Sequence, residues 1–169
     1  MIRKLLVWWI FTLFFITNPI IINAQDTNTY RWSLPLENLK ITSGYGYRIH
    51  PVTKQHDFHK GIDLAARCDP VLSVLAGIVT ETGYNPILGK YVRIGHGDFQ
   101  SIYGHLSYIL VCRGDTVDAK QPIAITGTTG RVTGEHLHFS VKFRNNPINP
   151  LLFLWQMALP EQMPSITKQ

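Results

Sequence analysis

The sequence predicts an all-β fold, an antiparallel β-sandwich or split-barrel-like single domain. A length of 169 residues suits one domain, and a chain that is 45% hydrophobic and 16% charged can form a complete core. Short runs rich in β-branched and aromatic residues alternate with glycine and proline, whereas apolar residues at helical spacing are nearly absent. Short strands at close spacing, with turn residues between them, indicate an antiparallel architecture.

The first 24 residues resemble a secretory signal peptide in composition. Arg3 and Lys4 precede the uncharged apolar run 5–16, and Ala24 is a small residue suited to a cleavage site. The alternative is an uncleaved membrane anchor, but Pro19 interrupts the segment before it reaches the roughly 20 apolar residues of a spanning helix. We therefore expect an exported protein of the periplasm, cell envelope or extracellular space, with no stable membrane insertion after cleavage.

The rest of the chain divides into three predicted parts. Residues 25–40 are polar and turn-rich and form an N-terminal lead-in, residues 41–154 form the domain, and residues 155–169 form a C-terminal tail. Strands are expected at 71–82, 90–94, 99–103, 122–126 and 136–143. The strands 90–94 and 99–103 are joined through Gly95, His96, Gly97 and Asp98, which predicts a hairpin with a four-residue turn.

Charge and cysteine content limit the possible partners and cross-links. The formal charge of +5 becomes +3 when the two cations Arg3 and Lys4 are removed. Such a mildly basic chain, without a run of basic residues, gives no indication of nucleic-acid binding. Cys68 and Cys112 permit one disulfide in an exported protein, but the sequence leaves open whether they meet.

Two histidines lie on one face of the predicted strand 136–143. Apolar and polar residues alternate along this strand, so His136 and His138 leave the core face on the same side. Alone, this pair would be interpreted as two surface histidines on a half-exposed strand.

A second cluster supports a metal-binding interpretation of the first. His59 and Asp63 share a face if their segment is extended, and Gly61 between them allows close backbone approach. Imidazole nitrogens and carboxylate oxygens bind zinc, and catalytic zinc sites keep three protein ligands and one open position. His59, Asp63 and His138 supply such a set, so we expect one zinc ion in an open, catalytic site.

Further motifs connect these clusters with a known family. The motifs are Gly46-Tyr47-Arg48-Ile49-His50-Pro51, Phe58-His59-Lys60-Gly61-Ile62-Asp63, Tyr103-Gly104-His105-Leu106-Ser107, Gly127-Thr128-Thr129-Gly130 and Thr133-Gly134-Glu135-His136-Leu137-His138-Phe139. In order and approximate spacing they resemble the motifs of lysostaphin-like (LytM-type) zinc peptidoglycan endopeptidases. The resemblance extends over roughly residues 43–150.

The resemblance implies both a site and a reaction. It assigns His59, Asp63 and His138 to zinc, places His105 and His136 in catalysis beside the metal, and implies an open groove over the zinc site. The implied reaction is hydrolysis of peptide cross-links in bacterial peptidoglycan by a zinc-activated water. Which cross-link is cut and which histidine is the general base remain open. Glu135 and Ser140 depart from the common family pattern, which often has proline and an acidic residue there.

The sequence contains four further candidate site residues and is compatible with two alternative functions. Tyr45, Arg48, His50 and Tyr103 are candidates for the substrate groove, although aromatic residues in β proteins are more often part of the core. The expected partner is the peptide stem of peptidoglycan, bound by a monomer. One alternative is a non-catalytic wall-binding or hydrolase-activating protein on the same fold, but all five metal and catalytic positions are filled. The other alternative is a β-sandwich carrier domain. The absence of a carrier lysine in a suitable turn argues against it.

Overall fold

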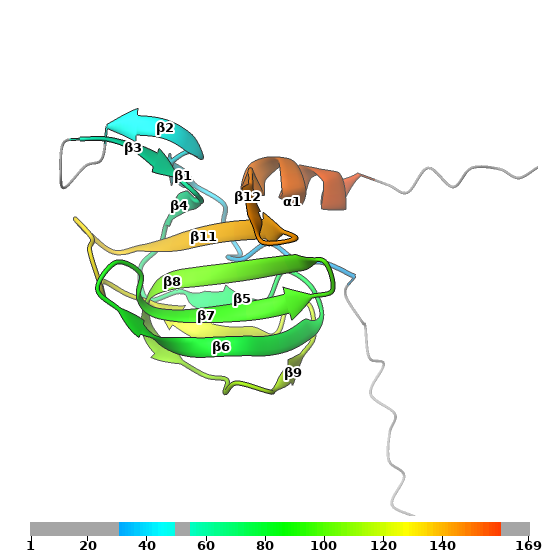
Figure 1. Cartoon of the computed structure of the whole chain (residues 1–169). Helices are drawn as coiled ribbons and strands as arrows, with labels where there is room; N and C mark the ends of the chain where they lie inside the picture. Colours follow the sequence, from blue (N-terminus) through cyan, green and yellow to red (C-terminus); the bar gives the residue numbers. More distant parts are fainter. Residues whose placement is uncertain (1–30, 50–54, 160–169) are drawn as a thin grey trace, which may run out of the picture.

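A computed structural model describes residues 31–49 and 55–159 (Figure 1). The predicted signal peptide, most of the predicted tail and the groove candidate His50 lie outside the described residues. The strands are β1 (Ile41–Ser43), β2 (Gly46–Ile49), β3 (His56–His59), β4 (Ile62–Ala65), β5 (Pro70–Leu72), β6 (Gly77–Asn85), β7 (Gly89–His96), β8 (Phe99–Ile109), β9 (Thr116–Val117), β10 (Pro122–Thr126), β11 (His136–Phe143) and β12 (Asn146–Ile148). The helix is α1 (Pro150–Ala158).

The predicted antiparallel β architecture is confirmed. One large sheet has the strand order β1-β4-β11-β8-β7-β6-β9, with β10 pairing β5 and β8, and β12 pairing β11. Strands β2 and β3 form a separate two-stranded sheet. Every strand pair described is antiparallel. Figure 1 shows β6, β7 and β8 as one layer in front of β5, with the β2–β3 pair projecting beyond β11.

The apolar faces of these strands form one core. Its fully buried members include Ile62, Leu64, Val71, Val79, Val92, Ile94, Leu106, Ile123, Leu137 and Phe139. Removal of this apolar surface from water is the main force that stabilises such a fold. Leu36, from the predicted lead-in, is only 2% exposed and joins the same core. The last part of the lead-in is therefore packed against the domain.

Two sequence predictions need correction in their boundaries. The predicted hairpin exists, but β7 and β8 extend until His96 pairs with Phe99, which leaves a two-residue turn in place of four. Gly97 supplies the positive φ of 72° in this turn. The predicted boundary between domain and tail at residue 154 falls inside α1, which continues to Ala158.

The sequence analysis did not predict α1, because this helix contains no charged residue and only one strongly polar side chain. An apolar helix shows no amphipathic period, so periodicity alone does not reveal it. Its start follows local rules: the Asn149 side chain accepts a 3.0 Å hydrogen bond from Leu151 N, and Pro150 occupies the first turn. Phe153 and Leu154 are buried in the core.

The two cysteines are both free and exposed. Cys68 precedes β5 and lies near the Thr126 end of β10. Its neighbour Asp69 accepts a backbone hydrogen bond from Thr126 N. Cys112 follows β8 at the opposite end of β10, beyond the hydrogen bond from Leu110 N to Ile123 O. A disulfide requires Cα atoms within about 7 Å, so this topology keeps the pair apart.

Candidate metal centre and catalytic cleft

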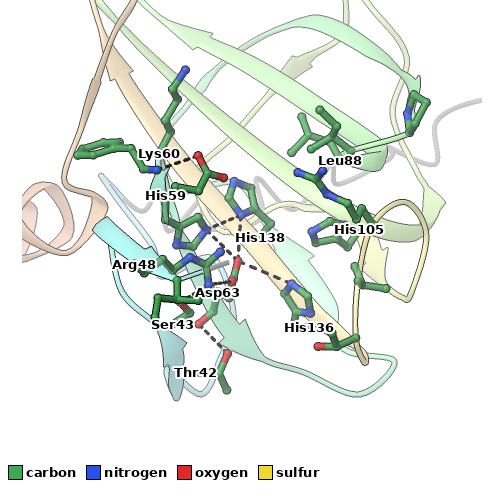
Figure 2. A pocket seen from close by; sticks show the side chains of 18 of the residues that line it. Thr42, Ser43, Arg48, His59, Lys60, Asp63, Leu88, His105, His136 and His138 are labelled. Atoms are coloured by element: carbon green, nitrogen blue, oxygen red, sulfur yellow. Dashed lines mark hydrogen bonds and ion pairs between the residues drawn. The ribbon is translucent and has the colours of Figure 1, made fainter. Parts of the chain in front are cut away.

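Three neighbouring segments bring the predicted zinc ligands together (Figure 2). His59 is the last residue of β3, Asp63 lies in β4, and His138 lies in β11 directly opposite Asp63. Between the first two, Gly61 passes close to β11: a Cβ there would lie 2.7 Å from both His138 Cε1 and Phe139 O. The short turn between β3 and β4 therefore fits over His138 only when residue 61 has no side chain.

The donor atoms of these residues have the separations that a zinc ion needs. Asp63 Oδ1 lies 2.9 Å from His138 Nδ1 and 3.2 Å from His59 Nε2, and the two nitrogens lie 3.2 Å apart. Zinc bonds of about 2.0–2.1 Å in a tetrahedron place ligand atoms about 3.3 Å apart. His59, Asp63 and His138 thus fit zinc in both chemistry and spacing, and they form the zinc site of this chain.

Neighbouring groups orient the ligands. His59 Nδ1 donates a 2.7 Å hydrogen bond to Gly44 O, which leaves Nε2 free to face the metal position. Burial of Asp63 by itself raises its carboxyl pKa. The hydrogen bonds and charges of His138 and His59 outweigh burial and hold the pKa of Asp63 well below its ordinary value. Asp63 is therefore an ionised ligand at neutral pH.

Two further histidines lie beside the metal site. Their rings have centroids 4.7 Å apart, and His136 Nε2 lies 3.7 Å from Asp63 Oδ1. Each ring donates from Nδ1 to a backbone carbonyl at 2.9 Å, His105 to Thr129 O and His136 to Gly134 O. In a neutral ring this places the proton on Nδ1 and leaves Nε2 as an acceptor.

His105 has an unusual environment for a histidine. Burial is the main cause that lowers its pKa, the charges of His136 and His138 add to it, and the pKa falls to about 4. Its backbone has a positive φ of 62°, which is rare for a residue with a Cβ. The hydrogen bond from His105 N to Leu88 O, 2.7 Å long, supports this conformation. His105 is therefore neutral at pH 7.

The metal site lies in an open cleft of about 1090 Å³. One side includes Arg48, Ile49 and Phe58 of the β2–β3 pair, and Lys60, which follows β3. The other side is formed by residues 85–88 and 131–133. This volume is slightly above the range for small-molecule sites, about 300–1,000 Å³, and leaves room for a peptide.

The predicted groove residues have different positions. Arg48 lines the cleft. The prediction for Tyr103 is wrong: it is 0% exposed in the core, and its hydroxyl accepts a hydrogen bond from Val74 N. Tyr45 packs edge-on against Phe58 and donates to Pro147 O, outside the cleft lining. The cleft residues that the sequence analysis missed include Ile87, Leu88, Arg131 and Val132, which lie in loops without a chemical pattern.

An antiparallel β domain with a two-histidine, one-carboxylate zinc site in an open cleft has the layout of a zinc metallopeptidase. The chain belongs to Peptidase family M23, whose sequence pattern matches residues 57–150.

Comparisons with individual proteins agree with the family. The chain is 43% identical to peptidoglycan DD-endopeptidase ShyA of Vibrio cholerae over 106 residues, which are 62% of this chain and 25% of that protein. The fold is similar to a zinc-containing peptidase from Vibrio cholerae, with a TM-score of 0.66 and 38% identity over 72% of this chain and 39% of the other. It is also similar to the catalytic domain of the antimicrobial peptidase lysostaphin from Staphylococcus simulans, with a TM-score of 0.64 and 29% identity over 70% and 93% of the two chains. The chain spans about a quarter of the length of ShyA.

Proposed function

We propose that this chain is an exported zinc metalloendopeptidase that hydrolyses peptide cross-links of bacterial peptidoglycan. The supporting observation is the arrangement of five side chains: three ligands with donor atoms 2.9–3.2 Å apart, and His105 and His136 next to them in an open cleft. The resemblance to a protein described as a peptidoglycan DD-endopeptidase favours a cross-link between D-amino acids as the bond that is cut.

The residues around the metal position have separable roles in this proposal. A zinc ion held by His59, Asp63 and His138 would supply a Lewis acid, which polarises a carbonyl and lowers the pKa of water. His105 and His136 both line the cleft, and because each Nδ1 bonds to a backbone carbonyl, Nε2 is the ring nitrogen left for the reaction. A neutral imidazole in this position can accept a proton from an attacking water and donate it to the leaving amine. We assign these proton transfers to the two histidines together.

Export and domain organisation complete the proposal. Residues 1–24 act as the signal peptide, residues 25–40 as the lead-in and residues from 41 onward as the enzyme domain. Within residues 31–49 and 55–159, no helix is long and apolar enough to cross a membrane. The enzyme acts as a monomer in this proposal, since all five site residues come from one chain.

The non-catalytic alternative predicts a different set of residues. A wall-binding or activating protein needs neither a complete ligand set nor two histidines whose Nδ1 atoms are both fixed by backbone carbonyls. Both features are present here, and both serve hydrolysis.

The test is digestion of purified, cross-linked peptidoglycan by the zinc-loaded protein, with the products identified by mass spectrometry. We expect cross-linked muropeptide dimers to be converted to monomers, with cleavage at the bond between D-amino acids. Addition of a chelator should stop the reaction and added zinc should restore it. Intact dimers after incubation with fully zinc-loaded protein would refute the proposal.

A further inference from the structure

Arg48 connects the small β2–β3 sheet to the metal centre. It belongs to β2, whereas Asp63 belongs to β4 of the large sheet. Arg48 Nη1 lies 3.4 Å from Asp63 Oδ2 and also donates to Ser43 Oγ at the end of β1 (Figure 2). Both side chains of the ion pair are shielded from solvent, with exposed fractions of 23% for Arg48 and 11% for Asp63.

The two oxygens of Asp63 have different neighbours. Oδ1 faces the imidazoles, at 2.9 Å from His138 Nδ1 and 3.2 Å from His59 Nε2. Oδ2 faces the guanidinium of Arg48. The backbone of Asp63 is held as well, because Thr42 Oγ1 donates a hydrogen bond to the Asp63 backbone carbonyl. The carboxylate therefore has one oxygen directed at the metal position and one held by a cation.

We propose that Arg48 is a positioning residue that holds Asp63 Oδ2 and thereby presents Oδ1 alone to the metal. A guanidinium keeps its charge at any pH at which the protein is folded, and its donors lie in a fixed plane that suits a carboxylate. Ser43 limits the freedom of the guanidinium from the other side. Without Arg48, the Asp63 carboxylate can rotate or offer both oxygens.

This role differs from the one that the sequence alone assigns to Arg48, which is contact with substrate in the groove. A substrate-binding arginine affects KM and leaves zinc affinity unchanged. A residue that positions Asp63 affects zinc affinity, and the KM of the fully loaded enzyme changes little. Partners that orient metal ligands in this way typically contribute 10–100-fold to metal affinity.

The test measures zinc affinity directly, by competition with a chromophoric chelator, in Arg48→Ala, Arg48→Lys and Ser43→Ala. We expect Arg48→Ala to raise the zinc Kd about 10–100-fold. Arg48→Lys should restore part of this loss, because it keeps the charge without the fork of donors. Ser43→Ala, which leaves Arg48 in place, should raise the Kd by a smaller factor. Arg144→Ala is the matched control, since it removes an exposed arginine–aspartate pair of 3.1 Å with Asp98.

The visible absorption of the cobalt-substituted protein provides a second measurement. We expect Arg48→Ala to reduce the absorption intensity, because coordination through both Asp63 oxygens raises the coordination number. An unchanged zinc Kd in Arg48→Ala would overturn the proposal, as would an equal rise in Arg144→Ala. If Arg48→Ala does not fold, an unchanged Kd in both Arg48→Lys and Ser43→Ala would overturn it. Only the expectation for KM rests on the proposed function, because zinc affinity and cobalt absorption are measured without substrate. A wild-type protein that binds zinc but leaves peptidoglycan intact would refute that function alone.

Discussion

Asp63 Oδ1 lies 2.9 Å from His138 Nδ1, across the pairing of β4 with β11. This contact joins two adjacent strands at directly opposite positions, where the backbone fixes the distance between Cα atoms. His59 reaches the same point from the end of β3. Two of the three ligands are therefore placed by sheet pairing, and the third depends on the turn that Gly61 permits.

The first prediction concerns the ligands themselves. His138→Ala should abolish tight zinc binding, because two ligands remain where a catalytic zinc site needs three. Peptidoglycan hydrolysis should be lost with the metal. Zinc content after dialysis and a turbidity assay on purified walls would measure both effects. His56→Ala, a substitution at an exposed position in β3, is the control and should keep both properties. Stoichiometric zinc in His138→Ala would contradict the assignment.

The second prediction separates proton transfer from metal binding. His136→Ala and His105→Ala should each lose hydrolysis, about 10²–10⁴-fold in kcat, because a positioned acid or base contributes that much. Both variants should retain zinc, since neither residue belongs to the set His59, Asp63 and His138. Hydrolysis rates at saturating zinc, measured beside the zinc content, would show the separation. Normal wall digestion by His136→Ala would refute its catalytic role.

The ligand set was predictable from sequence because it depends on local patterns. Strand 136–143 alternates apolar and polar residues, and the structure has β11 over the same residues with Leu137, Phe139 and Val141 buried. The direction of these side chains follows from a few consecutive residues. The extended segment expected for His59 and Asp63 is interrupted at residues 60–61, between β3 and β4, and the two side chains still meet because Gly61 allows this turn to pass close to His138.

Tyr103 shows where such reasoning fails. Simple alternation places Tyr103 and His105 on one face, yet Tyr103 is in the core and His105 lines the cleft. The left-handed backbone of His105, with φ of 62°, interrupts the pleat, and the register of β7 with β8 shifts between Lys90 and Val92. Residues 103–107 alone do not predict this conformation. The hydrogen bond that supports it joins His105 N to Leu88 O, and Leu88 lies far from His105 in the sequence.

The third prediction concerns the turn over His138. Gly61→Ala should lower the free energy of unfolding by about 1–3 kcal/mol, the usual cost of inserting an atom into a filled space. It should also weaken zinc binding, because the new Cβ would lie 2.7 Å from His138 Cε1 and 2.8 Å from His138 Nε2. Gly44→Ala is the matched control, since nothing lies within 4 Å of its added Cβ. Urea unfolding and chelator competition would measure the two effects. Equal behaviour of both variants would argue against this packing constraint.

The fourth prediction concerns pH and a histidine away from the cleft. His96 Nδ1 donates to Ala76 O at 2.9 Å, and its Nε2 accepts from Ser101 Oγ at 2.8 Å. Burial lowers the pKa of His96, against the opposing effect of the Ala76 hydrogen bond. The folded protein therefore binds a proton at His96 less readily than the unfolded chain, whose histidines titrate near about 6.5. Stability should decrease as pH falls through that value, because the unfolded chain then binds more protons.

His96→Gln isolates this contribution. The variant should be less stable than the wild type near neutral pH, since it loses the paired contacts to Ala76 and Ser101. Its further loss of stability between about pH 7 and about pH 5 should be smaller than that of the wild type, because one proton-linked group has been removed. Urea unfolding of the zinc-free proteins at both pH values gives the two differences. His56→Gln, at an exposed position in β3, should keep the wild-type difference. If His96→Gln lost as much stability as the wild type on acidification, the His96 imidazole would not be the linked group.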